Sequence, residues 1–228
     1  MSTFGYVIFA TIAGLGLALL LRRVQNRRIA RLQEFARENL LRFERSRSTT
    51  GNATTVTFSS TIEGWTLKTY RKTKTNASSS ASSSIRWTEW ENPQIKLPSG
   101  TAMLGPALPK QAAQSMNALM GSMVGGMVLR LLERHFDTDL DGLQAVESTV
   151  GDDRGIILST PENHEILMPI YGNAELLTFG KSRKINAQPI VIIDENSFRI
   201  RVRHLFHNPD DLRAMIDLGK NLSNLIRV

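Results

Sequence analysis

The sequence predicts an α+β fold, in which an N-terminal transmembrane helix and a basic juxtamembrane helix precede antiparallel strands with packed helices. Three observations lead to this prediction. Residues 4–21 contain no charged side chain, residues 54–95 are rich in alternating β-branched and aromatic residues, and residues 116–135 and 212–226 repeat apolar residues at helical spacing. The expected order of elements after the N-terminal helices is β-β-β-α and then β-α-β-β-α.

The uncharged run, FGYVIFATIAGLGLALLL, predicts a transmembrane anchor over residues 1–21. At about 1.5 Å per residue, its length just covers a hydrocarbon core of about 30 Å. Arginines follow almost at once, and cationic residues beside a span are retained on the cytoplasmic side. The sequence therefore predicts a single-pass protein of the inner membrane with its C-terminal domain in the cytoplasm. A cleaved signal peptide is the alternative, but its positive residues would precede the apolar run.

The positive charge of the chain is concentrated beside this run. The net charge is +7 in total, and residues 22–47 hold nine arginines against three glutamates, a net of +6. The remaining chain, 48–228, holds nineteen lysines and arginines against eighteen acidic residues, a net of only +1. Each cation beside a membrane gains about 1 kcal/mol from an anionic leaflet, whereas a nucleic-acid binder carries its basic stripe on the folded domain. The predicted partners are therefore a protein of unknown identity and lipid headgroups, but no nucleic acid. The headgroups would bind Arg22, Arg23, Arg27 and Arg28.

Residues 22–53 are predicted to form the juxtamembrane helix and a linker. Ile29, Ala36 and Phe43 repeat every seven residues, which extends the predicted helix to about residue 47. The stretch that follows is rich in Ser, Thr, Gly and Asn, which typically interrupt regular structure.

Residues 54–228 are expected to form the soluble α+β domain, with 54–136 and 150–228 as possible halves. Alternating β-branched and aromatic residues predict three strands in the first half, at 54–60, 65–75 and 85–95. Trp87 and Trp90 are three positions apart, so they would face opposite sides of a flat strand unless a bulge lies near them.

The apolar residues of 116–135 follow the helical template without a miss and predict a core helix. The elements expected after it are a strand at 155–159, a helix beginning at 160–162, hairpin strands at 189–194 and 197–205, and a last helix opening at Asn208. In the second hairpin strand, Arg199, Arg201 and Arg203 alternate with apolar residues. This alternation predicts a half-buried strand with one cationic face.

Taken together, the single N-terminal span, the Ile-Leu-Ser-x-Pro-Glu junction at 157–162 and the Pro-Asp-Asp helix start at 209–211 suggest a family. The pattern resembles a loose group of uncharacterised bacterial membrane-anchored α+β proteins. The resemblance covers about residues 55–225 and rests on element order and apolar pattern. It implies the same fold and membrane location, and it transfers no site residue because the group has no assigned activity.

The motif DTDLDG at residues 137–142 begins like the calcium-binding loop of an EF-hand. In such a loop Asp137, Asp139 and Asp141 would supply carboxylate oxygens to the metal. Ser148 stands where the loop needs a bidentate glutamate, so the alternative is an acidic turn that ends a helix.

The chain shows no catalytic signature. It has no cysteine, which excludes disulfides, thiolate nucleophiles and cysteine-ligated metals. It also lacks an HExxH motif, a Gly-x-Ser-x-Gly nucleophile turn and a phosphate-binding glycine loop. The chain is therefore predicted not to be an enzyme and to need no cofactor.

The alternative interpretation is a membrane-tethered enzyme whose site would include histidines. The residues that would have to converge in its site are His135, Asp137, His204 and His207. His164 lies between Glu162 and Glu165 and is expected on an exposed helix face, with an acid–base pair as the alternative.

The leading functional hypothesis is a membrane-anchored protein whose cytoplasmic α+β domain serves as an interaction or structural module. It rests on the anchor, the arginine-rich helix and the lack of a catalytic constellation. A homodimer is a further possibility, because Ala10, Gly14 and Ala18 recur every four residues and let two helices approach closely.

Overall fold

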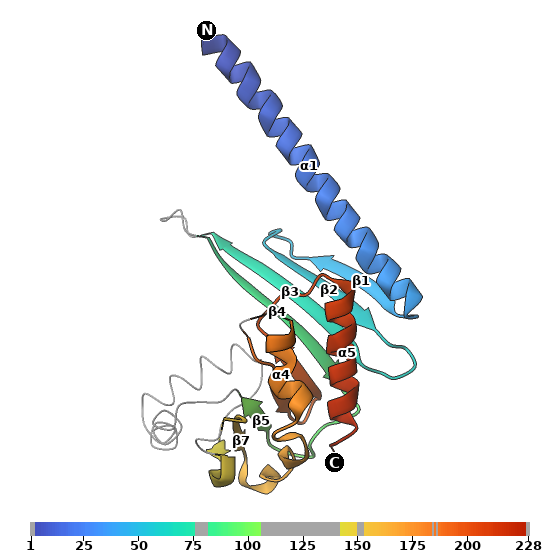
Figure 1. Ribbon diagram of the computed structural model, residues 1–228, viewed down its shortest axis with the longest axis vertical. Coiled ribbons are helices and arrows are strands. Elements are labelled where there is room, and N and C mark those ends of the chain that lie inside the picture. Colours follow the sequence, from blue (N-terminus) through green and yellow to red (C-terminus); the bar gives the residue numbers. More distant parts are fainter. Residues whose placement is uncertain are drawn as a thin grey trace.

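The structure is a computed structural model that describes residues 3–75, 82–105, 142–149, 153–183, 185 and 187–226. It confirms the α+β class, with three α-helices and one antiparallel sheet in these residues (Figure 1). The helices are α1 (Thr3–Glu38), α4 (Ala174–Ser182) and α5 (Pro209–Ser223). The strands are β1 (Arg42–Arg47), β2 (Ala53–Ser59), β3 (Thr66–Thr75), β4 (Ser82–Asn92), β5 (Ala102–Gly105), β6 (Gln144–Ala145), β7 (Ile156–Ser159), β8 (Ile190–Ile193) and β9 (Phe198–Val202).

The nine described strands follow the spatial order β1-β2-β3-β4-β9-β8-β5-β7-β6. The first four form a meander of long strands, and β9 joins this meander to the shorter strands (Figure 1). Helices α1, α4 and α5 lie on one face of the sheet, which we call the inner face. The opposite face is called the outer face.

The inner face forms the apolar core because alternate residues of neighbouring strands lie side by side on it. Across the meander and β9, the register places Phe58 beside Leu67, Leu67 beside Trp90, and Trp90 beside Ile200. All four side chains are fully buried. The last helix, α5, packs over β4 and β9 with the apolar stripe that its sequence predicts.

Helix α1 packs on the sheet with its C-terminal part only, while its first half extends away from the strands (Figure 1). Leu32, Phe35 and Ala36 are buried, and the ring of Phe35 meets Phe58 edge-on with 5.6 Å between centroids. The Asn39 side chain then donates a hydrogen bond at 2.7 Å to the Phe35 carbonyl, which also accepts the Asn39 backbone N–H at 3.1 Å at the end of the helix.

The prediction of a transmembrane anchor is contradicted. Among the helices formed by the described residues, none is long and apolar enough to cross a membrane. The uncharged run also contains Gly14 and Gly16, and α1 continues from it without a break into the arginine-rich stretch. The predicted single-pass topology and inner-membrane location are corrected accordingly.

The predicted helix over residues 22–47 is also too long. Helix α1 ends at Glu38, and Leu40 has a positive φ of 54°, which turns the chain back. Residues 42–47 pair with β2 as the edge strand β1. Phe43, the third member of the predicted seven-residue repeat, packs its ring against Phe58 from the strand, with 5.6 Å between centroids.

Two further predictions about strands have different outcomes. Trp90 lies on the inner face and Trp87 on the outer face, as predicted, and the β3–β4 register is continuous without a bulge. Strand β9 is not half-buried, because all five of its residues are buried. Its arginines Arg199 and Arg201 reach carboxylates on the outer face instead of solvent.

The helix predicted from residue 160 is replaced by two short 3₁₀ helices, η2 (Pro161–Asn163) and η3 (Met168–Ile170). The Asn163 side chain binds the Ser99 carbonyl at 2.9 Å and so ties this segment to the loop before β5. Helix α4 then begins after Asn173, whose side chain accepts hydrogen bonds from two backbone N–H groups of the first turn. The predicted core helix at 116–135 lies outside the described residues.

Candidate functional site

Of the four residues that the enzyme alternative requires, the structure describes only His204 and His207. His204 and His207 follow β9, whereas His135, Asp137, Asp139 and Asp141 lie outside the described residues. Among the residues that the structure describes, no group of three or more His, Cys, Asp or Glu side chains is placed to hold a metal ion.

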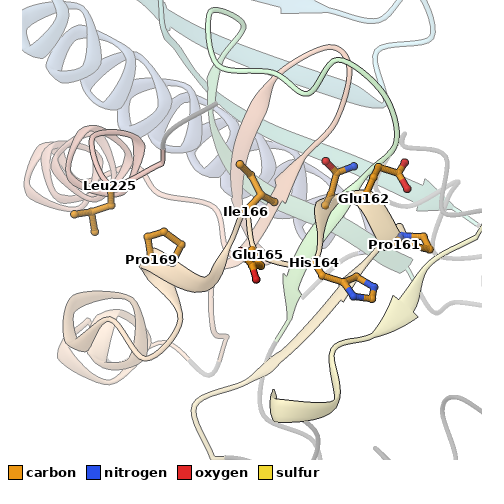
Figure 2. Close-up of a pocket in the computed structure, with 8 residues that line it drawn as sticks. Pro161, Glu162, His164, Glu165, Ile166, Pro169 and Leu225 are labelled. Atoms are coloured by element: carbon orange, nitrogen blue, oxygen red, sulfur yellow. The ribbon is translucent and has the colours of Figure 1, made fainter.

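An open hollow of about 790 Å³ lies along residues 161–169 and is bounded by Leu225 from the end of α5 (Figure 2). Figure 2 shows the His164 ring and the Glu162 carboxylate pointing in different directions. The Nε2 atom of His164 has no hydrogen-bond partner in the described part of the structure. The alternative of an acid–base pair therefore has no support in this geometry.

A second hollow, of about 130 Å³, lies between α1, the inner face of β1 to β3 and residues 205–207. We call it the arginine cleft, because Arg28 of α1, Arg45 of β1 and Arg71 of β3 line it. Its remaining walls are largely apolar, and they comprise Ile29, Leu32, Val56, Leu205 and Phe206 with Gln25, Thr54, Thr69 and His207.

The arginines that the strands contribute to the cleft occupy inner-face positions. They continue the alternation that the buried residues begin along each strand. In β3, Leu67 and Thr69 are buried on the inner face, and Arg71 occupies the next inner-face position. The register places Arg47, Thr54, Arg71 and Arg86 in one row across β1, β2, β3 and β4. The paired strands therefore fix the backbone positions of these arginines beside one another.

A third hollow, of about 530 Å³, adjoins the arginine cleft and shares Leu205 and His207 with it. It is lined by Arg86, Arg203 and His204 together with Ser84 and Ile85. The Arg86 guanidinium donates a hydrogen bond to the Ser84 hydroxyl at 2.8 Å. None of the described residues that line either hollow is acidic.

The charges of the arginine cleft are not neutralised by the described residues. Within the described ranges, no carboxylate forms an ion pair with Arg28, Arg45 or Arg71. Burial, and then the nearby charge of Arg71, lower the pKa of Arg28. Like charges held close together in a partly apolar site repel one another, and an anion bound between them would remove this repulsion.

The outer face shows the opposite arrangement, in which buried cations and carboxylates are paired. Arg201 of β9 binds Glu89 of β4 at 2.5 Å, and its guanidinium also lies 4.9 Å from the ring centre of Trp87. Arg199 forms an ion pair with Asp194. These pairs hold β9 against its neighbours and leave the carboxylates engaged with cations.

Glu91 of β4 adds Lys68 of β3 to this network of charged residues. Its carboxylate binds the Lys68 ammonium at 2.5 Å and accepts a hydrogen bond from the Ser197 hydroxyl at 3.1 Å. Burial acts to raise the pKa of Glu91, but the hydrogen bond and charge of Lys68, with smaller effects of Ser197 and Arg199, hold it below its usual value. Glu91 is thus an ionised acceptor that stabilises the sheet.

Arg28 and Arg45 stand in the basic run at 22–47, where Arg28 was expected to bind lipid headgroups, whereas Arg71 and Arg86 were not singled out from the sequence. The pattern that identifies Arg71 and Arg86 is the alternation of inward and outward side chains along each strand, which gives residues of the same parity the same face. Arg71 has the parity of buried Leu67, and Arg86 has that of buried Trp90, so cations stand where the apolar pattern calls for an inward side chain. The other part of the cleft comes from α1 and residues 205–207, which only the fold brings beside the strands.

Comparisons with protein-family models, with curated proteins and with solved structures find no match to this chain.

Proposed function

We propose that this chain is a non-catalytic binding module, and that its arginine cleft recognises an acidic segment of a partner protein. The observation that carries this proposal is the arginine cleft, where Arg28, Arg45 and Arg71 line one hollow without a lining carboxylate among the described residues. Guanidinium groups bind carboxylates through paired, charge-assisted hydrogen bonds. An acidic side chain is therefore a suitable ligand for the cleft.

The position of the arginines on strands supports binding. Arg45 and Arg71 are carried by paired strands of one sheet, and Arg28 is carried by the part of α1 that packs on that sheet. Because the backbone that carries these arginines is already ordered, binding of a ligand has to order only their side chains. The scaffold thus favours recognition of a defined partner over loose electrostatic attraction.

The walls of the cleft favour a protein ligand over a nucleic acid. Val56 and Phe206 are buried beside the arginines, together with Leu32. A volume of about 130 Å³ is close to the ~150 Å³ of a cavity that accepts one benzene molecule. A segment in which acidic residues flank one apolar side chain satisfies both the charge and the apolar walls.

The test is a binding titration of the full chain with a fluorescently labelled peptide of sequence Glu-Glu-Leu-Glu-Glu. We expect saturable binding that weakens with salt, because exposed charges are screened. Replacing Arg71 with Gln should weaken binding roughly tenfold, since a charge-assisted hydrogen bond contributes about 1.5–3 kcal/mol.

The matched control is Arg37→Gln, which removes the same charge from an exposed position of α1 where Arg37 binds Glu34 at 2.6 Å. This variant should bind the peptide like the unmodified chain. Equal losses in both variants would show unspecific attraction and contradict the proposal. Tighter binding of duplex DNA or of anionic lipid vesicles than of the peptide would contradict the proposed partner class.

A further inference from the structure

Strand β1 is an edge of the sheet, and its free side is open in the described structure. It pairs only with β2, through six residue pairs from Arg42 with Ser59 to Arg47 with Thr54. All but one of its six residues are exposed. The strand contains no proline and its register has no bulge, although both devices commonly block edge strands from further pairing.

The hydrogen-bond register shows which backbone groups face the free side. The Ser48 N–H donates to the Ala53 carbonyl at 3.0 Å, which extends the β1–β2 ladder by one pair. Because bonded and non-bonded pairs alternate in antiparallel strands, the even-numbered residues of β1 bond to β2. The backbone groups of Phe43, Arg45 and Arg47 therefore point outward, and within the described ranges no loop or helix backbone pairs with them.

The side chains of the same three residues lie on the inner face. Phe43 lies beside Phe58 in the register, and Arg45 lines the arginine cleft. A strand added beside β1 would place alternate side chains on the inner face next to Phe43, Arg45 and Arg47. Opposite charges on neighbouring strands attract, and like charges repel.

The charge of β1 selects the kind of strand that can pair with it. Arg42, Arg45 and Arg47 outnumber Glu44, so a basic segment would be repelled. Two copies of β1 that pair antiparallel through these outward-facing residues, centred on Arg45, would set the two Arg45 side chains beside one another. An acidic extended segment has neither conflict.

We propose that β1 binds an acidic extended segment of a partner protein by strand addition, as a further strand of the sheet. This inference rests on the proposed function, because it specifies the conformation in which the acidic segment binds and its place beside the cleft. Main-chain hydrogen bonds to Phe43, Arg45 and Arg47 supply affinity, and the arginines select acidic side chains.

The first experiment compares Arg45→Pro with Arg45→Gln in the full chain. Both variants lose the same charge, but only proline removes the outward N–H, and an edge strand tolerates proline where that N–H faces solvent. We expect Arg45→Pro to bind the acidic peptide a further three- to tenfold more weakly than Arg45→Gln, roughly the effect of one main-chain hydrogen bond. Circular dichroism checks that both variants are folded.

The second experiment leaves the protein unchanged, so it decides the matter even where Arg45→Pro fails to fold. Two Glu-Glu-Leu-Glu-Glu peptides carry backbone N-methyl groups on the odd-numbered or on the even-numbered residues. Only alternate N–H groups of an added strand face β1. We therefore expect one peptide to lose roughly tenfold or more in affinity and the other to bind nearly as well as the unmethylated peptide.

The outcomes separate this inference from the proposed function. Peptide binding that is insensitive to both methylation patterns, with equal affinity for Arg45→Pro and Arg45→Gln, would overturn strand addition and leave the acidic ligand in place. Failure of the unmethylated peptide to bind would overturn both proposals. A dimer of the unmodified chain that Arg45→Pro dissociates would show that β1 pairs with a second copy, and this would also overturn the inference.

Discussion

Gly219 of α5 lies against the indole of Trp90 in β4, so closely that a Cβ at position 219 would overlap the ring. The absence of a side chain at this one position allows the helix to approach the sheet. Trp90 is fully buried and also meets Phe198 of β9 edge-on, with 6.1 Å between centroids. The contact therefore sets the distance between α5 and the centre of the sheet.

We predict that Gly219→Ala lowers the free energy of unfolding by about 2 kcal/mol, because overpacking a core costs ~1–3 kcal/mol. The loss should occur although alanine is favoured over glycine in a helix by up to about 1 kcal/mol. Chemical denaturation of the single variant, of Trp90→Leu and of the double variant measures the coupling. In the Trp90→Leu background, Gly219→Ala should be neutral or stabilising. An unchanged loss of stability would show that the added methyl group clashes with a residue other than Trp90.

The buried pair of Glu89 and Arg201 gives a second prediction. Replacing Glu89 with Leu leaves a buried guanidinium without its carboxylate, and we expect a loss of about 3–5 kcal/mol. Replacing both residues, with Leu and Met, should restore at least half of that loss, because a buried ion pair and an apolar pair have similar net stability. Urea denaturation midpoints of the two variants provide the test, and a double variant less stable than the single one would contradict it.

The pH dependence of stability should reflect Glu91. Its pKa is lower in the folded chain than the value of 4.5 that a free glutamate side chain has, so ionised Glu91 stabilises the folded state above about pH 4.5. This contribution is lost as the pH falls through the folded-state pKa. Between neutral pH and about pH 3, the unmodified chain should therefore lose more stability than Glu91→Gln. Parallel loss in thermal melts of both proteins would show that Glu91 does not contribute.

The arginine cleft should reduce stability slightly in the absence of a ligand. We expect Arg71→Gln to raise the free energy of unfolding by roughly 0.5 kcal/mol at low ionic strength, because it removes a repulsion from Arg28. The gain should vanish near 1 M salt, where the Debye length is about 3 Å. Arg37→Gln is the control and should give no such gain, since Arg37 is paired with Glu34. A destabilised Arg71→Gln at low salt would contradict the prediction.

Local patterns predicted much of the fold. The strands β2, β3, β4, β7, β8 and β9 and the helix α5 all lie near their predicted positions. Alternation and capping residues act over a few positions, so they are visible in the sequence itself. Asn208, for example, caps α5 by accepting a hydrogen bond from the Asp210 N–H.

The errors occur where distant contacts override local preference. Residues 42–47 continue a helical repeat in the sequence, but pairing with β2 and the contact of Phe43 with Phe58 make them a strand. Strand β5 was not predicted, and it lies between β8 and β7, which are separated from it in sequence. The membrane prediction counted uncharged residues, whereas the described helices do not reach the length and apolarity of a span.

The candidate site was predictable only in part. Arg28 and Arg45 stand in a basic run that composition alone identifies, but Arg71 and the position of all three arginines around one hollow became visible only through the fold. The repulsion between Arg28 and Arg71 joins residues more than forty positions apart. No local pattern reports such a pair.

The place of β9 beside β4 has a consequence for synthesis of the chain. The Thr88 hydroxyl of β4 donates a hydrogen bond to the His204 carbonyl at 2.8 Å, across 116 positions of sequence. The hairpins of β1 to β4 are local and can form as soon as they leave the ribosome, but β4 must wait for β9. At typical rates of about 5–20 residues per second, that wait lasts roughly 5–20 s. During this time the free side of β4 is an unpaired strand edge, and this is the interval in which the nascent chain most needs protection from aggregation.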